Sequence, residues 1–588
     1  MEKLCSGQRK NILRQVLAYL LWLMPLFSYP LVWLRPVYGK LPLWGDVLFI
    51  SSHVTGIIAA AIILLFPERV KNIFSKPLPR VWLIAVLVSG VLAVANHILF
   101  PGNPAMLLAA TQTLLLPIAG AALSPELRRA AIPCGAVTCI ILLFFTITGD
   151  KFLTGFTGNW NWNFTMICAT IPALTAWFIP KKHPFLTASI INVILMTVVV
   201  LCFPALAPRG TIAALILAAL IAPAIRKISR ERRTTALVGV ALAIGFLFLS
   251  ATNAPISSQV NDSRFQLWKS SVAMAKKHLF TGCGTGRFEQ AVRHHMTKEY
   301  FFTEYAATRH PHPHNELIFY ISEFGIAGAV MFILFCGCAL KYTSHKNDYA
   351  SRWLIWLFLL LLLHGQVDVL LSTPLAGSYF LLAGGALAAR GTRKTQVKAA
   401  TLRKTLSVIL FICAAVFAVN IFIATSHLRN AKLLIREPQP IAALEQLSIS
   451  LKKFPVPEAR YIAANILLFD LKQPAAAITQ LLKLEHEICG GFHHSYGVTA
   501  RALTALGKFD SAKEYFALER EAFPYSALYA GYELAMLELS KAPAIDIKNA
   551  HQRLIRNLEL RNFKPSDIPM LQNAIHLDDE PLKWSKLK

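Results

Sequence analysis

The residues best suited to chemistry in this chain of 588 residues gather at the end of one polar stretch, residues 252–314. The stretch closes on the run His312-Pro-His314-Asn315-Glu316, and a further His-Pro pair precedes it. Histidines in such number are candidate metal ligands. Alternating prolines, however, favour an extended backbone that sends successive side chains apart, and no cysteine or carboxylate partner stands at ligand spacing. We therefore predict no metal site and an acid–base or anion-stabilising role for His314.

The neighbouring motifs have structural alternatives. Asn315 and Glu316 are suited to capping the amide groups at the start of the following helix. Upstream, Gly282-Cys-Gly-Thr-Gly286 resembles a phosphate-binding loop only superficially, because it lacks the spacing and the Lys-Ser/Thr pair of such loops. We expect this glycine cluster to be a flexible turn at the membrane surface.

Guanidinium groups form the second set of candidates. Arg209 is the only cation of a short turn at the mouth of an apolar segment, and Arg264 and Arg287 lie in the polar stretch. Arginine forks bind phosphate or pyrophosphate through paired hydrogen bonds, although a lone Arg209 could also be snorkelling to the membrane interface. His364 and Asp368 stand four residues apart and so share a helix face. They are either functional polar residues of a membrane segment or a mutual pair that holds helices together.

The elements that must position these residues are membrane helices. Hydrophobic residues make up 55% of the chain and charged residues 15%, with a mean hydropathy of +0.49, whereas soluble proteins average about 25% charged residues. This composition excludes an ordinary soluble enzyme, and it argues against the nucleic-acid partner that a net charge of +27 would otherwise indicate. About thirteen apolar runs approach the ~20 residues that a helix needs to cross a bilayer. They cover residues 12–34, 45–66, 81–100, 105–123, 130–148, 164–180, 185–207, 210–225, 234–251, 315–340, 353–371, 374–389 and 405–425.

The positive charge reports orientation, because short cytoplasmic loops of membrane proteins are rich in Lys and Arg. With the N-terminus in the cytoplasm, seven short segments on the inner side hold 26 Lys and Arg residues, and the five short outer loops hold 4. The alternation persists along the whole membrane region. It predicts that the polar stretch 252–314 and the chain after residue 425 lie on the outer side of the membrane.

The tail at 426–588 has the balanced composition of a soluble helical domain, with 21 Lys and Arg against 18 Asp and Glu. It carries a weak internal repeat, in which four residues recur thirty-five positions later. These are Leu468, Lys472, Ala477 and Leu481, followed by Leu503, Gly507, Ala512 and Phe516. The repeat predicts two or three helical hairpins of tetratricopeptide type, with degenerate hairpins of no repeat ancestry as the alternative. We therefore predict an all-α protein with a membrane domain at 1–425 and a hairpin domain at 426–588.

One block of the membrane domain resembles a known signature. His312-Pro-His314-Asn315-Glu316-Leu317, with Glu323, Gly325 and Gly328 behind it, is similar to the signature of the bacterial O-antigen ligase and O-antigen polymerase superfamily. That superfamily includes the O-linked oligosaccharyltransferases that glycosylate pilins and other periplasmic proteins. The resemblance spans about residues 150–390. Its supporting matches are Arg209-Gly210, Arg264 with Trp268, the glycines before Phe288, and His364, Asp368, Pro374-Leu375 and Tyr379-Phe380.

The resemblance implies an integral glycosyltransferase of the bacterial inner membrane, with a GT-C-like membrane domain. Its donor would be a glycan on undecaprenyl pyrophosphate, and it would need no metal or other cofactor. Arg209 and Arg264 would bind the pyrophosphate, and His314 would activate or orient the acceptor hydroxyl. The residues that would shape or bind the substrates are Arg287, His312, Asn315, Glu316, His364 and Asp368.

The acceptor distinguishes the members of the superfamily. The periplasmic hairpin domain after residue 425 makes the chain most like the protein O-oligosaccharyltransferases, because hairpin repeats commonly grip other proteins. We therefore expect transfer to Ser or Thr of a periplasmic protein such as pilin. A ligase acting on lipid A–core is the second reading and a polymerase the third. A transporter of lipid-linked glycans is disfavoured, because the chain shows no helix-scale repeat and its polar residues cluster at the outer rim.

Overall fold

The computed structural model describes most of the chain, and every regular element in its described residues is a helix. The described residues are 2–28, 44–99, 115–148, 160–178, 185–202, 209–227, 263–296, 312–342, 348–368, 373–389, 416, 419–420, 423–488 and 491–559. The predicted all-α class is confirmed over these residues. The predicted span 234–251 and most of 405–425 lie outside them.

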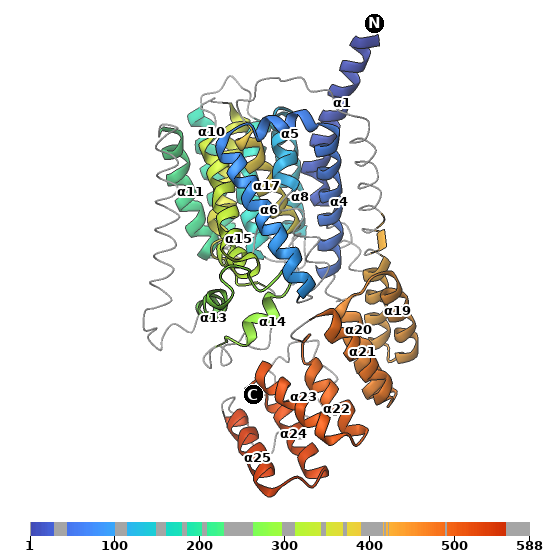
Figure 1. Ribbon diagram of the computed structural model, residues 1–588. Coiled ribbons are helices and arrows are strands. Elements are labelled where there is room, and N and C mark those ends of the chain that lie inside the picture. Colours follow the sequence, from blue (N-terminus) through green and yellow to red (C-terminus); the bar gives the residue numbers. More distant parts are fainter. Residues whose placement is uncertain are drawn as a thin grey trace.

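The first part of the chain forms a bundle of roughly aligned helices (Figure 1). Its N-terminal half comprises α1 (Glu2–Leu23), η1 (Met24–Ser28), α4 (Trp44–Leu65), α5 (Pro67–Ile73), α6 (Pro77–Leu99), α8 (Ser124–Thr148), α9 (Trp160–Phe178), α10 (Phe185–Cys202) and α11 (Arg209–Lys227). Its remaining helices are α15 (Glu316–Lys341), α16 (Tyr349–His364) and α17 (Pro374–Ala388). Two short helices, α13 (Ser263–Lys277) and α14 (Phe288–Arg293), cap one end of the bundle (Figure 1).

Two buried tryptophans in the bundle interior hydrogen-bond through their indole nitrogens to neighbouring helices. The indole nitrogen of Trp22 donates to the carbonyl of Leu127 at 3.1 Å, and that of Trp353 donates to the carbonyl of Ala169 at 2.9 Å. In each bond the donor and the acceptor lie on two helices that pack together, so both bonds cross-link neighbouring helices. A buried indole that kept its N–H unpaired would be costly in an apolar interior.

Membrane character follows from the apolar helices. Within the described residues, Ser124–Phe144 and Glu316–Lys341 are long and apolar enough to cross a membrane, and Pro67–Ile73 with Pro77–Leu92, bent by 106°, would make a third span. Other apolar helices are shorter: Tyr349–His364 has 16 residues, or about 24 Å of helix against a hydrocarbon core of about 30 Å. The structure therefore supports an integral membrane protein, and the number of spans stays a prediction.

Two glycines allow helix backbones to touch inside the bundle. A Cβ atom on Gly385 of α17 would lie 2.2 Å from the carbonyl oxygen of Pro117, and one on Gly120 would lie 2.9 Å from the carbonyl oxygen of Leu382. The helical stretch 115–122 and α17 therefore meet backbone to backbone. Small residues at such crossings are the usual way for membrane helices to gain close packing.

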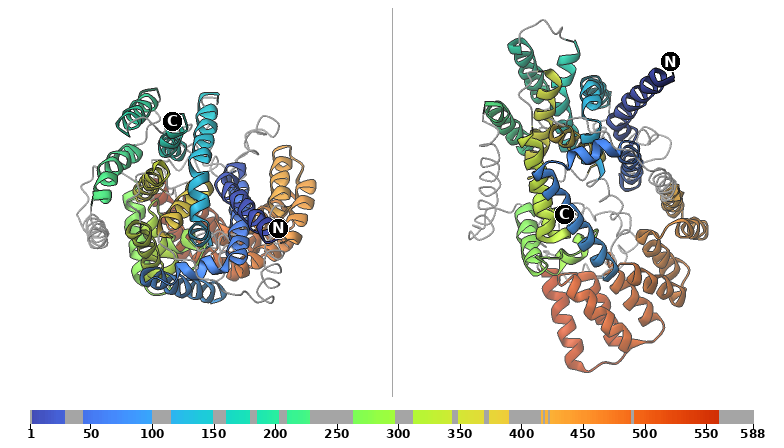
Figure 2. Two further views of the ribbon diagram at one scale, coloured as in Figure 1. Left: turned by 90° about the horizontal axis from the view of Figure 1, so that it is seen from above. Right: turned by 45° about the horizontal axis from the view of Figure 1, so that its top comes forward.

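The tail forms helical hairpins that extend from the capped end of the bundle (Figures 1 and 2). A helix at 423–436 precedes α19 (Pro440–Lys453), α20 (Pro457–Asn465) with η4 (Ile466–Asp470), α21 (Pro474–Glu487), α22 (Ser495–Ala505), α23 (Phe509–Ala522), α24 (Ala527–Leu539) and α25 (Ala544–Glu559). Consecutive members pair across short turns into four hairpins, one or two more than the sequence predicts.

The thirty-five-residue repeat corresponds to equivalent places in successive hairpins. Lys472 and Gly507, which the repeat aligns, both lie in hairpin turns with positive φ, at 54° and 69°. Ala477 and Ala512 are both fully buried where paired helices approach. The aligned pairs Leu468 with Leu503 and Leu481 with Phe516 are also buried. The repeated residues therefore do the same packing work in neighbouring hairpins.

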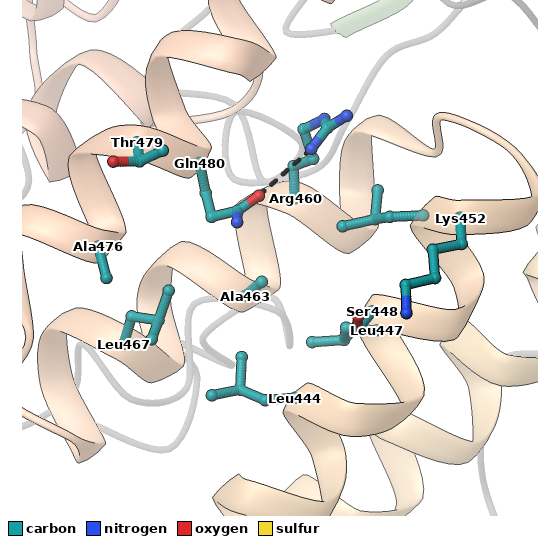
Figure 3. Close-up of a pocket in the computed structure, with 11 residues that line it drawn as sticks. Leu444, Leu447, Ser448, Lys452, Arg460, Ala463, Leu467, Ala476, Thr479 and Gln480 are labelled. Carbon is teal, nitrogen blue, oxygen red and sulfur yellow. Dashed lines mark hydrogen bonds between the residues drawn. The ribbon is translucent and has the colours of Figure 1, made fainter.

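A groove opens between the first two hairpins (Figure 3). It encloses a cavity of about 550 Å³ whose floor is apolar, with Leu444 and Leu447 of α19 and Leu467 of η4. Arg460 at its rim donates to the side-chain oxygen of Gln480 at 3.3 Å and to the Glu487 carboxylate at 2.6 Å. The groove is thus apolar inside and its rim arginine is already paired.

The close approach at Gly385 predicts a stability loss for a larger residue. We expect Gly385→Leu to lower the free energy of unfolding by about 1–3 kcal/mol, because its side chain would force α17 off the neighbouring backbone. Gly90→Leu is the matched control, since no atom lies within 4 Å of a Cβ at Gly90. The thermal unfolding midpoints of both variants in detergent would test this, and equal midpoints would contradict it.

Candidate functional site

A buried carboxylate gathers the candidate residues at the capped end of the bundle. Nδ1 of His314 lies 3.1 Å from Oδ1 of Asp368, and Nη2 of Arg264 lies 4.0 Å from Oδ2. Arg264 also donates through Nη1 to the carbonyl of Val367 at 2.9 Å. The structure thus brings together His314, Arg264 and Asp368, which come from three separate elements.

One of these three side chains is buried, and the other two are partly exposed to solvent. Asp368 is 2% exposed, whereas His314 is 32% and Arg264 37% exposed. The carboxylate can only accept hydrogen bonds when ionised, so Nδ1 of His314 carries the proton that faces it. In the neutral imidazole this leaves the lone pair on Nε2. A buried acid therefore orients a histidine and an arginine that both reach the surface.

The backbone of His314 has φ of 53°, a left-handed conformation that is uncommon outside glycine. Contacts on either side hold it there. The indole nitrogen of Trp268 on α13 donates to the carbonyl of Pro313 at 2.7 Å, and the amide of Glu316 donates to the carbonyl of Gly365 at 2.8 Å. The site histidine is therefore clamped between α13 and the end of α16.

Asn315 caps α15, as the capping interpretation of this residue predicts, and Glu316 is the first residue of the helix. Oδ1 of Asn315 accepts the amide of Ile318 at 3.0 Å, and Nδ2 donates to the carbonyl of Gln366 at 2.8 Å. Asn315 thus caps α15 and also ties it to the turn that carries Asp368. The side chain of Glu316 is 2% exposed, so it lies inside this junction.

His364 does not form the mutual pair with Asp368 that the shared helix face suggests. Nδ1 of its buried ring lies 2.9 Å from Oγ1 of Thr165, and Nε2 lies 3.4 Å from Oγ1 of Thr211. The two threonine hydroxyls are 2.9 Å apart. This network joins α9, α11 and α16, while Asp368 turns to His314.

The network also places the start of α11. Arg209 is the first residue of α11, two residues before Thr211, so the helix begins beside the end of α16 that leads to Asp368. The side chain of Arg209 lies outside the described residues. Thr165 and Thr211 could not be predicted from the sequence, because an isolated threonine in an apolar helix carries no distinguishing signal.

The glycine cluster is not the loose surface turn that the sequence predicts. Helix α15 is broken at Gly325, whose φ is 66° and ψ is −160°, and the glycine loop packs into this break. A Cβ on Gly282 would lie 2.3 Å from the backbone of Glu323. The amide of Cys283 donates to the carbonyl of Ser322 at 2.8 Å, which holds the loop against the helix. Because the two backbones are so close, only glycine fits at position 282.

Side chains complete this lock between loop and helix. The Glu323 carboxylate accepts the amide of Gly286 at 2.9 Å. Arg287 donates to the carbonyl of Cys283 at 3.2 Å, which stabilises the same loop. Glu323, Gly325 and the glycine cluster therefore support the start of α15, which carries the site, from the side of the glycine loop.

Within the described part of the chain, no group of three or more His, Cys, Asp or Glu residues could hold a metal ion.

His312 is held neutral next to the site. Its ring meets that of Phe319 edge-on, with centroids 5.4 Å apart. Burial and, to a smaller extent, the neighbouring His314 lower the pKa of His312, and Glu289 partly offsets both, so that the pKa is about 3. His312 therefore carries no charge near neutral pH and contributes shape to the site.

The pKa of His312 predicts a pH-dependent stability term. The unfolded chain protonates this histidine below its ordinary pKa of 6.5, and the folded protein resists protonation down to about 3. Its contribution to stability is thus complete above pH 6.5 and is lost as the pH falls towards 3. We expect His312→Gln to show a smaller drop in unfolding temperature between pH 7.5 and 5.5 than the wild type. His551→Gln, on the surface, is the control and should show the same drop as the wild type. A drop in His312→Gln equal to that of the wild type would refute the prediction.

Comparison with known proteins gives a family match that covers part of the site. Residues 191–333 match the family model described as O-Antigen ligase. The match includes Arg209, Arg264 and His314, and Asp368 lies beyond its end. A comparison with curated proteins gives no match. The chain therefore contains an O-antigen ligase family domain, carried by an integral membrane protein.

Proposed function

We propose that the protein is a glycosyltransferase that moves a glycan en bloc from undecaprenyl pyrophosphate to a hydroxyl group of a periplasmic acceptor. Enzymes of the matched family transfer lipid-linked glycans. The observation that carries the proposal is the pairing of His314 and Arg264 with one buried carboxylate, Asp368. It combines a candidate base with a cation suited to a phosphate leaving group.

In the proposed reaction, Nε2 of His314 takes the proton of the acceptor hydroxyl as its oxygen attacks the anomeric carbon of the glycan. Asp368 keeps the imidazole in the required tautomer and stabilises the imidazolium that forms. The bond between the anomeric carbon and the pyrophosphate oxygen breaks, and undecaprenyl pyrophosphate leaves with the electron pair.

The arginines supply the second half of the proposed chemistry. Arg264 faces the surface beside His314, and we propose that it stabilises the negative charge that develops on the leaving pyrophosphate. Arg209 joins it, on the support of its place at the start of α11. Arg287, Asn315, Glu316, His312 and His364 act by shaping the site, in keeping with the contacts described above.

Substitutions of His314 and of its carboxylate partner test the base. We expect His314→Ala to lower the rate of glycan transfer by about 10²–10⁴-fold, the usual contribution of a general base. Asp368→Asn should lower it as well, because an amide side chain allows the wrong tautomer. The measurement is transfer by the purified protein in lipid, using a radiolabelled undecaprenyl pyrophosphate-linked glycan. His551→Ala, on the exposed face of α25, is the control; wild-type rates in His314→Ala would exclude this mechanism.

We propose that the membrane domain has about thirteen spans with its N-terminus in the cytoplasm. The placement of α1 and the hairpin domain at opposite ends of the bundle supports this topology (Figure 1). Alkaline phosphatase folds only outside the cytoplasm, so we expect a fusion at Glu559, the end of α25, to be active. A fusion at Lys71, in a segment assigned to the inner side, should be inactive. The opposite pattern would overturn the topology.

We propose a protein as the acceptor, with transfer to Ser or Thr, as in pilin glycosylation. We propose that the hairpin array is tetratricopeptide-like and grips this protein. The support is its repeated turns and buried small residues and the groove with an apolar floor between its first two hairpins (Figure 3). Expression in a strain that has a lipid-linked glycan but no ligase would separate the acceptors. Modified pilin supports the proposal, whereas modified lipid A–core or a lengthened glycan would identify a ligase of lipid A–core or a polymerase.

A further inference from the structure

One arginine joins the cap of the bundle to the hairpin domain. Arg293, the last residue of α14, is 9% exposed. Its Nη1 donates to the carbonyl of His493 at 3.3 Å, and its guanidinium lies 4.6 Å from the centre of the Phe523 ring. Nη2 binds Glu289 one turn earlier at 2.5 Å. The arginine is thus fixed on its own helix and covers a surface 200 residues further along the chain.

The surface of the hairpin domain that Arg293 contacts is held in place by contacts within that domain. The ring of His494 stacks on that of Tyr529, with centroids 4.7 Å apart, and lies tilted against that of Phe523, with centroids 4.1 Å apart. Its Nδ1 lies 2.6 Å from Oε1 of Glu519, a carboxylate that is 1% exposed and also accepts the amide of Gly497 at 2.9 Å. The aromatic face that Arg293 covers is therefore held in place by a buried ion pair or hydrogen bond within the hairpin domain.

This contact also occurs where the hairpin array is irregular. The chain passes from α19 to α20 and from α23 to α24 through three or four residues, whereas the connection from Glu487 of α21 to Ser495 of α22 is longer. His493, which receives the hydrogen bond, lies in that connection with φ of 51°. The longer connection thus interrupts the repeat at the place where the domain meets the cap.

Packing connects Arg293 to the site. Phe288 and Val292 of α14 belong to one buried cluster with Leu267 and Met274 of α13. Helix α13 carries Arg264 and Trp268, which contact the Asp368 turn and the backbone before His314. The hairpin domain is therefore attached, through one short helix, to the element that positions the site.

We infer that Arg293 is a positioning residue that docks the hairpin domain on the cap, so that a protein acceptor held by the hairpins presents its hydroxyl to His314. The inference rests on the proposed transfer to protein. Holding both reactants on one body raises the effective concentration of the acceptor hydroxyl at the site. Arginine suits this task because its planar group stacks on an aromatic ring and donates at its edge, which lysine cannot do in the same way.

The test compares Arg293→Ala and Arg293→Lys with the wild type in the full-length protein in lipid. Acceptors are a purified soluble pilin ectodomain, and water, which releases free glycan. We expect Arg293→Ala to raise the KM for the pilin ectodomain about tenfold with kcat within twofold, and to leave the release of free glycan unchanged. Arg293→Lys should lie between. Lys513→Ala, which removes an exposed ion pair with Asp546 elsewhere in the domain, is the control and should behave as wild type.

A measurement independent of activity accompanies the kinetics. Spin labels at the exposed positions Lys269 and Asn549 should give a broader or longer distance distribution in Arg293→Ala than in the wild type. An unchanged KM together with an unchanged distance overturns the inference, and so does a loss of free-glycan release equal to the loss of transfer, which would mean a defect in the site itself. Failure of the proposed function is distinct, because the wild type would then modify no pilin at all.

Discussion

The site depends on one buried negative charge. Moving a carboxylate out of water is unfavourable unless charged or hydrogen-bonding partners compensate, and Asp368 is almost fully enclosed. His314 and Arg264 supply that compensation from two other elements. The electrostatic requirement of one residue thus fixes the placement of both surface-facing groups. Because Asp368 faces Nδ1 of His314, it also decides which nitrogen of the imidazole is left for chemistry.

Two further arrangements keep this geometry in place. Asn315 and Trp268 hold the backbone around His314 against the α16 turn and α13, so that the left-handed conformation of the histidine persists. Behind it, the glycine loop fills the break of α15 at Gly325. Backbone strain of this kind survives only where surrounding contacts determine it, and it is typical of functional sites.

The hairpin domain extends from the end of the membrane bundle that carries the site (Figure 1). Two successive hairpins bury equivalent small and apolar residues, as Ala477 and Ala512 illustrate. The one longer connection between hairpins is also the one that meets Arg293. A repeat array gains its stability from neighbouring repeats, and here the array is interrupted where it meets the cap, as the docking role requires.

The sequence alone determined the features that depend on composition and local spacing. Apolar runs predicted an all-α membrane protein. The thirty-five-residue repeat predicted helical hairpins, whose turns contain the aligned residues Lys472 and Gly507. Residue type and position marked His314 and Arg264 as site residues. Tertiary structure alone decided the partnerships. Spacing by four suggested that Asp368 pairs with His364, but the folded chain gives it His314, 54 residues away, and gives His364 two threonines. Local spacing reports only contacts within one helix, whereas these pairings, the glycine lock on α15 and the contact of Arg293 arise from how separate helices pack.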